Sequence, residues 1–277
     1  SNKEIKKLKH FNPCAHSESV LYIDKDEVLK FLDPVFADDR KETVERLSDI
    51  HHKNCITPLY SIIMDDYFSG YAMKYYKKYM VLSKKIIDPS IPYSQRLIIA
   101  KQIWEVLNFF KSINYSYIDL HEDNIIMNDE FDLQFLDLDS GCFKEFRGEN
   151  EYNIGVIMSS NRACIMTLNI LFGVKPMDFY ENFEKNSFAI KKMLTTKQRA
   201  LFEHALEESH EFNGLEYIDE FDEETVNHIK NKLKLQQKTQ RFRCVIVYSF
   251  SLSFLTCPKE NLSKVIVTTK SLPSPRA

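Results

Sequence analysis

Three polar residues near the middle of the chain have types and spacing that could support chemistry. Asp119 and Asn124 are separated by four residues, and Asp137 follows two short apolar runs joined by a polar turn. A carboxylate can orient a hydroxyl group or accept its proton, and carboxylate and amide oxygens are ligands that suit Mg²⁺. We therefore expect these side chains to converge on one site that handles a hydroxyl group and a bound metal ion.

The composition sets broad limits on the protein class. The 277 residues, 44% hydrophobic and 28% charged, can form one or two domains with a sizeable core. A net charge of -3 gives no sign of a nucleic-acid partner. The chain has no signal-peptide pattern and no apolar run long enough for a transmembrane helix. Six cysteines without metal-ligand spacing indicate reduced thiols and a cytoplasmic location.

Residues 1–76 are predicted to form a small, strand-rich lobe. Two apolar runs, 20–23 and 27–31, flank a polar turn and indicate a hairpin. Apolar residues recur at helical spacing over residues 38–50. A second hairpin is predicted from residues 59–76, with Asp65-Asp66 and Ser69-Gly70 between its apolar runs.

Residues 77–237 are predicted to form a mainly helical lobe. Ser94 is a candidate cap for a long helix that ends near Ser112. The chain is predicted to be helical again from Asn153, with breaks at residues 173–176 and at Gly214.

The tail, residues 238–277, differs sharply in composition. It holds seven basic residues and one acidic residue, and its apolar stretch of 14 residues is too short to span a bilayer. A strand pair or a poorly ordered tail is the preferred interpretation. The alternatives are a membrane-surface or partner-binding segment, and a sequence foreign to the natural protein, such as one from a shifted reading frame.

Several segments resemble the protein-kinase-like fold, in the divergent branch that includes bacterial eukaryotic-like kinases. Residues 119–124 match its D-x-x-x-x-N catalytic loop, residues 52–60 resemble its H-P-N-I-V-x-L-Y stretch, and residues 70–76 resemble the strand and hinge that hold adenine. The resemblance covers residues 17–173 well. It implies an α+β, bilobal fold in which a five-stranded small lobe with one helix sits on a helical large lobe, with ATP between them.

The resemblance also implies how the phosphates of ATP are held. Residues 27–30 resemble V-A-I-K, which makes Lys30 the phosphate-binding lysine. A carboxylate must hold this lysine, and Glu45 is the first candidate, with Glu42 second. Counting back from His52 places the family's glutamate nearest Thr43, so the partner stays open between these residues.

The remaining roles follow from the same resemblance. Met73 takes the gatekeeper position, and the backbone from Lys74 to Tyr76 is expected to bond adenine. Asp119 would orient the acceptor hydroxyl, and Asn124 and Asp137 would bind Mg²⁺. In addition, His121 can donate to a phosphate oxygen, and it occurs at this place in aminoglycoside and choline kinases.

The chain departs from the family pattern at four places. The glycine-rich loop has no glycine in residues 16–22, and Ile118 replaces the arginine that would grip a phosphorylated loop. Asp137-Leu138-Asp139 replaces D-F-G, so that Asp139 either adds a carboxylate near the metal or caps the next turn. Only 12 residues separate Asp137 from Asn150, where the next core helix is expected, so the platform for a peptide substrate is short.

The function expected from the sequence is ATP- and Mg²⁺-dependent phosphoryl transfer to a hydroxyl group. A divergent protein Ser/Thr kinase with a protein acceptor is the first expectation. One alternative is a small-molecule kinase of the aminoglycoside or choline type, which His121 and the short segment favour. The other alternative is a pseudokinase that acts as a binding or scaffold module, which the missing glycines favour.

Overall fold

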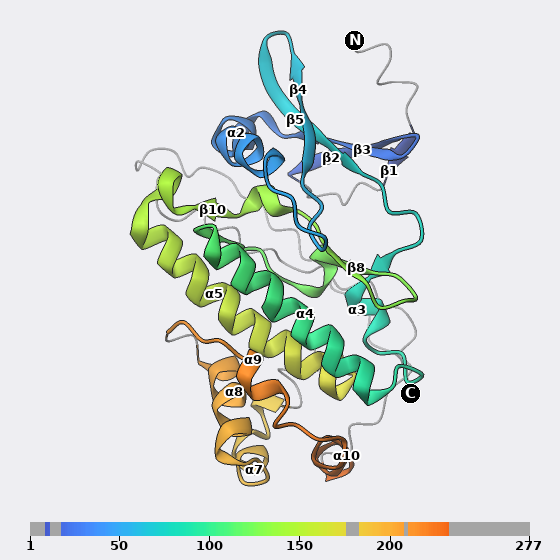
Figure 1. The fold of residues 1–277 in the computed structure, drawn as a ribbon, viewed down its shortest axis with the longest axis vertical. Coiled ribbons are helices and arrows are strands. Elements are labelled where there is room, and N and C mark those ends of the chain that lie inside the picture. The colour runs from blue at the N-terminus through green and yellow to red at the C-terminus, as the bar shows by residue number, and fades with distance from the viewer. Residues whose placement is uncertain (1–8, 12–17, 176–182, 208–209, 233–277) are drawn as a thin grey trace, which may run out of the picture. The chain divides into compact units, whose positions relative to one another are not determined.

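The computed structural model describes residues 9–11, 18–175, 183–207 and 210–232, which Figure 1 draws in colour. The chain divides into a compact unit of residues 1–237 and a second unit of residues 238–277. The second unit, with the predicted basic tail, lies outside the described residues, and so do residues 12–17, which include the start of the segment aligned with the glycine-rich loop. Within the first unit the protein is mixed α+β.

The N-terminal part is a five-stranded antiparallel sheet, as the sequence predicts. Its strand order is β1-β2-β3-β5-β4. The strands are β1 (Lys9–Phe11), β2 (Ser19–Asp24), β3 (Glu27–Leu32), β4 (Pro58–Met64) and β5 (Tyr67–Lys74). Burial alternates along β3, so Val28, Lys30 and Leu32 share its inner face. A lysine therefore points into the protein from the middle of the sheet.

One helix, α2 (Pro34–Ser48), packs against β4 and β5 (Figure 1). It begins four residues before the predicted start at Asp38, because the Asp33 side chain accepts a hydrogen bond from the Val35 amide at 3.0 Å and caps the helix. Proline is also favoured at the first helical position. Ala37, Val44 and Leu47 form the buried face of α2.

The second hairpin differs from the prediction at its turn. Asp65 and Asp66 alone make the turn, with φ values of 51° and 67°, and Gly70 lies inside β5. Gly70 has a φ of 146°, and a Cβ atom there would lie 1.9 Å from the carbonyl oxygen of Lys30. Glycine at this position lets β5 pass close to β3 beside Lys30.

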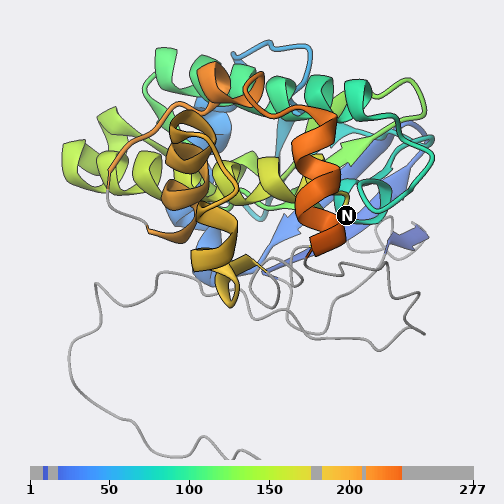
Figure 2. The same ribbon diagram turned by 90° about the horizontal axis from the view of Figure 1, so that it is seen from below.

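The C-terminal part is mainly helical. Its helices are α3 (Leu82–Lys85), α4 (Tyr93–Ser112), α5 (Lys144–Phe172), α7 (Ser187–Lys191), α8 (Thr196–Leu206), α9 (Leu215–Ile218) and α10 (Glu223–Lys232). Figures 1 and 2 show α4 and α5 side by side, and α8 packs against α5. The predicted Ser94 cap is wrong, because α4 begins at Tyr93 after Pro92 and has no side-chain cap.

Short strands and turns carry the predicted catalytic segments between these two parts. A three-stranded sheet joins β6 (Met80–Val81), β8 (Ile125–Met127) and β9 (Leu133–Phe135), and β7 (Tyr115–Ser116) pairs with β10 (Cys142–Phe143). Two 3₁₀ turns follow strands, η1 (Glu122–Asn124) after β7 and η2 (Leu138–Ser140) after β9. The Phe135 backbone also bonds Asn54 and Ile56, so β9 is tied to the segment that follows α2.

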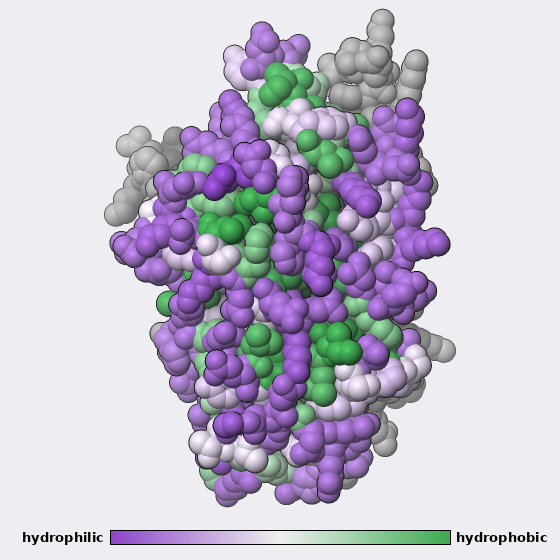
Figure 3. All heavy atoms as spheres, in the orientation of Figure 1, coloured by the Kyte–Doolittle hydropathy of each residue, from purple (hydrophilic) through white to green (hydrophobic). Residues whose placement is uncertain are grey.

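Two hydrophobic clusters stabilise these parts. One lies under the five-stranded sheet and includes Val28, Val44 and Met73, and the larger one joins the helices around Trp104 and Phe110. Of the described helices, α5 is long and apolar enough to cross a membrane, but most of it is buried within the protein, as in a core helix. On the face shown in Figure 3, apolar residues form small patches among hydrophilic ones.

We predict that Gly70→Ala lowers the free energy of unfolding by about 2–4 kcal/mol, because it adds a backbone clash to an unfavourable φ. The matched control is Gly148→Ala, since Gly148 has a φ of 84° but no atom within 4 Å of an added Cβ. Urea denaturation measures the free energy of unfolding of both variants. The difference between them gives the contribution of the clash, because both carry the cost of an unfavourable φ. Equal destabilisation of the two variants would contradict the prediction.

Candidate active site

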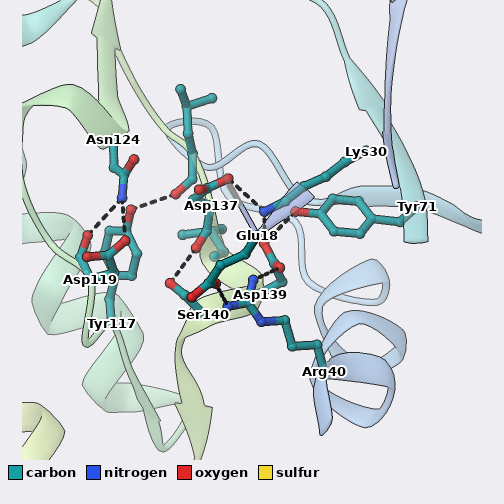
Figure 4. A network of polar contacts seen from close by, with 12 residues as sticks. Glu18, Lys30, Arg40, Tyr71, Tyr117, Asp119, Asn124, Asp137, Asp139 and Ser140 are labelled. Carbon is teal, nitrogen blue, oxygen red and sulfur yellow. Dashed lines mark hydrogen bonds and ion pairs between the residues drawn. The ribbon is translucent and has the colours of Figure 1, made fainter. Parts of the chain in front are cut away.

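Lys30 is the buried centre of a group of charged side chains (Figure 4). Only 2% of its side chain is exposed, and its Nζ donates to Asp137 Oδ1 at 2.8 Å and to Asp139 Oδ1 at 2.7 Å. Burial alone would lower the pKa of Lys30, but the two carboxylates hold it above its ordinary value. The lysine of β3 is therefore charged and in direct contact with the predicted metal-binding aspartate.

Asp139 is the most enclosed carboxylate of this group. Its side chain is fully buried, and it accepts hydrogen bonds from Lys30, from the Tyr71 hydroxyl at 2.6 Å and from Arg40 Nη1 at 2.8 Å. Burial favours the neutral acid, but the charges of Lys30 and Arg40 outweigh it and lower the pKa of Asp139 to about 2. The predicted turn-capping role of Asp139 is wrong, since its oxygens bind side chains of the sheet and of α2.

The expected partner of Lys30 on α2 is also wrong. Glu42 and Glu45 are exposed, and Lys30 instead pairs with Asp137 and Asp139. Residues three and four apart share a helix face, so Arg40 lies on the same side of α2 as the buried Thr43, Val44 and Leu47. The helix therefore presents a cation to the site, and this arginine also pairs with Glu18.

Asp119 and Asn124 form a second pair in the loop before β8. The Asn124 side-chain amide donates to the Asp119 carboxylate and to its backbone carbonyl, both at 3.0 Å. The Asn124 carbonyl accepts from the Leu136 amide at 2.8 Å, and the Tyr117 hydroxyl donates to the Leu136 carbonyl at 2.6 Å. These bonds tie the Asp119 loop to the residue before Asp137 (Figure 4).

His121 faces the Asp119 carboxylate. Its Nδ1 accepts from the Asp123 amide at 3.2 Å, which leaves the proton on Nε2, 3.7 Å from Asp119 Oδ2. Burial alone would raise the pKa of Asp119, but the neighbouring His121 and the hydrogen bond from Asn124 lower it. For His121 the effect of burial is likewise outweighed, and Asp119 raises its pKa. Asp119 is thus an ionised carboxylate with a proton donor beside it.

The donor set fits Mg²⁺ bound together with phosphate. Asp137 is 43% exposed, and only one of its carboxylate oxygens accepts a hydrogen bond within the described part of the chain. The side-chain oxygen of Asn124 has no hydrogen-bond donor there either. The described residues contain no group of three or more acidic, histidine or cysteine side chains arranged for a metal. Mg²⁺ is commonly held by one or two carboxylates and substrate phosphates, and the Asp137 carboxylate and the Asn124 amide oxygen are donor types that suit such an ion.

The predicted adenine-binding segment lies at the end of β5. Met73 is buried and lies opposite Val28 in β3. The Tyr75 amide donates to the Asp26 carbonyl at 2.8 Å, so this donor is engaged. The Tyr76 amide has no acceptor within the described residues, and the Lys74 ammonium lies 4.9 Å from the Tyr76 ring centre.

Sequence reasoning missed Arg40, Tyr71 and Glu18. Tyr71 could have been found from strand register, because it is directly opposite Lys30 in the β3–β5 pair. Arg40 carries a weaker signal, namely a basic residue on the apolar face of a predicted helix.

Two cavities are lined mainly by residues of the helical part. One of about 70 Å³ is lined by Trp104 and Tyr117 among others, one of about 270 Å³ includes His204 and His210, and Phe212 lines both. Lys30, Asp119, Asn124 and Asp137 line neither of these two cavities.

Comparisons with known proteins do not assign the chain to a family. No model of a protein family matches it, and a search of curated proteins finds no match.

We predict that the protein loses stability as the pH falls from about 4 to about 2. A carboxylate with a lowered folded pKa stabilises the fold above its unfolded pKa, and this is lost as it becomes protonated in the folded state. For Asp139, a folded pKa of about 2 against an ordinary 3.8 corresponds to about 2 kcal/mol. Urea denaturation at successive pH values measures this loss.

Asp139→Asn is expected to start less stable and to lose less stability over this pH range. Glu45→Gln is the control, because Glu45 is exposed on α2, and it should follow the wild-type curve. Parallel curves for wild type and Asp139→Asn would contradict the assignment of this acid loss to Asp139.

Proposed function

We propose that the protein is an ATP- and Mg²⁺-dependent phosphotransferase, a divergent protein Ser/Thr kinase with a bilobal kinase-like fold. One observation carries the proposal. The buried Lys30 of the sheet contacts Asp137 at 2.8 Å, and the Asp119–Asn124 pair is hydrogen-bonded to the residue before Asp137. Lys30 is thus in contact with the segment that contains Asp119, Asn124 and Asp137, and these four residue types support a proposal of phosphoryl transfer.

Each residue has a distinct role in this proposal. Asp137 and Asn124 hold Mg²⁺, which neutralises charge on the phosphates of ATP when it is bound. Lys30 donates to the α- and β-phosphates. Asp119, ionised at neutral pH, accepts a hydrogen bond from the acceptor hydroxyl and then its proton. His121, beside Asp119, donates to a phosphate oxygen.

A protein acceptor remains the first proposal, with a cytoplasmic location. The 12 residues after Asp137 form η2, β10 and the start of α5, which is interrupted at Gly148. This structured segment offers a peptide little length of chain to pair with. A protein acceptor is therefore recognised through a folded surface or is the kinase itself in cis.

Two observations favour the alternatives. His121 beside Asp119, together with the short segment, favours a small-molecule acceptor such as an aminoglycoside or an amino alcohol. The two carboxylates that already neutralise Lys30 favour a pseudokinase that acts as a binding module.

We predict that Asp119→Asn lowers the rate of Mg²⁺-dependent ATP turnover or autophosphorylation by roughly 10²–10⁴-fold, because the amide cannot take up the hydroxyl proton. Calorimetric titration should show that binding of Mg·ATP is retained. Asp123→Asn is the matched control, since Asp123 is in the same loop and bonds Ser83 at the surface. Equal rates for wild type and Asp119→Asn would contradict the assignment.

A comparison of acceptors is expected to show slow turnover of generic short peptides. The physical reason is that positioning supplies much of the rate of phosphoryl transfer, and the segment after Asp137 is short. Rates are measured with peptides, with intact protein, and with amino alcohols or aminoglycosides. Faster turnover of peptides than of intact protein would contradict the prediction, and turnover of the small molecules alone would select the alternative enzyme class.

A further inference from the structure

The two carboxylates that contact Lys30 have different surroundings. Asp137 is 43% exposed and accepts from Lys30 through one oxygen, Oδ1. Asp139 is fully buried, and both of its oxygens are engaged by three donors, namely Lys30, Tyr71 and Arg40. When two like groups share a site, such a difference in environment separates their roles. Asp137 is open to a new ligand, and Asp139 is not.

We propose that Asp139 positions Lys30 for phosphate binding in place of a glutamate from α2, and that Arg40 fastens α2 to Asp139. This inference rests on the proposed phosphotransferase function and names the residue that prepares its phosphate-binding lysine. Asp139 is a positioning residue, since it acts through Lys30. The kinase pattern predicts that the helix contributes the anion to this site. Here α2 contributes a cation, Arg40, and the turn η2 contributes the anion, Asp139.

The packing of α2 explains why it supplies no carboxylate. Thr43, Val44 and Leu47 are buried on the inner face of the helix, and Glu42 and Glu45 are exposed. Within the described residues, the ion pairs of Lys30 are those with Asp137 and Asp139. A buried ammonium group needs hydrogen-bond acceptors in place of water. Asp139, whose carboxylate lies 2.7 Å from Lys30 Nζ, therefore holds the lysine in place once Asp137 is engaged elsewhere.

Lysine has enough hydrogen-bond donors to keep its bond with Asp139 while a phosphate oxygen replaces Asp137. An ammonium group has three donors. In the structure one donor binds Asp137 and one binds Asp139. When Asp137 turns to Mg²⁺, its bond with Lys30 can be replaced by a bond with a phosphate oxygen, while Asp139 keeps the lysine in place.

Calorimetric titration with ATP, ADP and adenosine in the presence of Mg²⁺ tests this inference. Asp139→Asn keeps the shape of the side chain but removes its charge. We expect its affinity for ATP and ADP to fall by about tenfold or more, as is common when a supporting residue of a binding group is lost. Adenosine affinity should be unchanged, because adenosine has no phosphate for Lys30 to bind. Glu45→Gln is the control and should match wild type with all three ligands.

The outcomes separate the inference from the proposed function. If wild type binds no ATP, the proposed function fails, and the inference falls with it. If wild type binds ATP, an equal loss of ATP and adenosine affinity in Asp139→Asn would show a merely structural role and overturn the inference. Loss of ATP affinity in Glu45→Gln alone would overturn it as well.

Arg40→Gln is the second variant. It tests the inference if Asp139→Asn does not fold. It leaves both carboxylates on Lys30 and removes the contact from α2 to Asp139. We expect faster amide hydrogen exchange in residues 34–48 and a smaller loss of ATP affinity than in Asp139→Asn, again with adenosine affinity unchanged. Unchanged exchange in α2 together with unchanged ATP affinity would overturn the proposed coupling.

Discussion

The buried charge of Asp139 is the constraint on which the arrangement of the site depends. Removing a carboxylate from water costs several kcal/mol unless charged and hydrogen-bonded partners replace the water. Lys30 from β3, Tyr71 from β5 and Arg40 from α2 supply those partners. Three elements must therefore approach one turn, η2, and any displacement of α2 or of the sheet leaves a buried charge without its partners.

The same constraint places the residues expected to act on ATP. Asp137 precedes η2 directly and has a φ of 52°, in the left-handed region. Its neighbour Leu136 bonds the Asn124 carbonyl through its amide and the Tyr117 hydroxyl through its carbonyl. These hydrogen bonds thus fix the Asp119–Asn124 pair relative to the turn that contains Asp139. Short strands and turns hold the site.

This arrangement gives a physical account of two departures from the kinase pattern. An aspartate in place of the last residue of D-F-G would be unfavourable in a buried position, but here Lys30 and Arg40 compensate its charge. A glutamate on α2 is then unnecessary, and the helix can present Arg40 instead. These two departures, the aspartate at position 139 and the absence of a glutamate from α2 at Lys30, form one compensated set of charges.

The sequence by itself determined which local elements form, because apolar periodicity and turn residues act over a few positions. The hairpin of residues 20–31, the α2 helix and the β8–β9 hairpin follow from such patterns, and the spacing of Asp119 and Asn124 already places both in one loop. Only the tertiary structure decided which carboxylate meets Lys30. Glu45 and Asp139 carry the same charge, but they differ in their surroundings. Glu45 is on the exposed face of α2, whereas Asp139 is in a turn that is buried beside β3. Burial and charge pairing depend on contacts between residues about 100 positions apart, such as Lys30 and Asp139, and no local pattern encodes them.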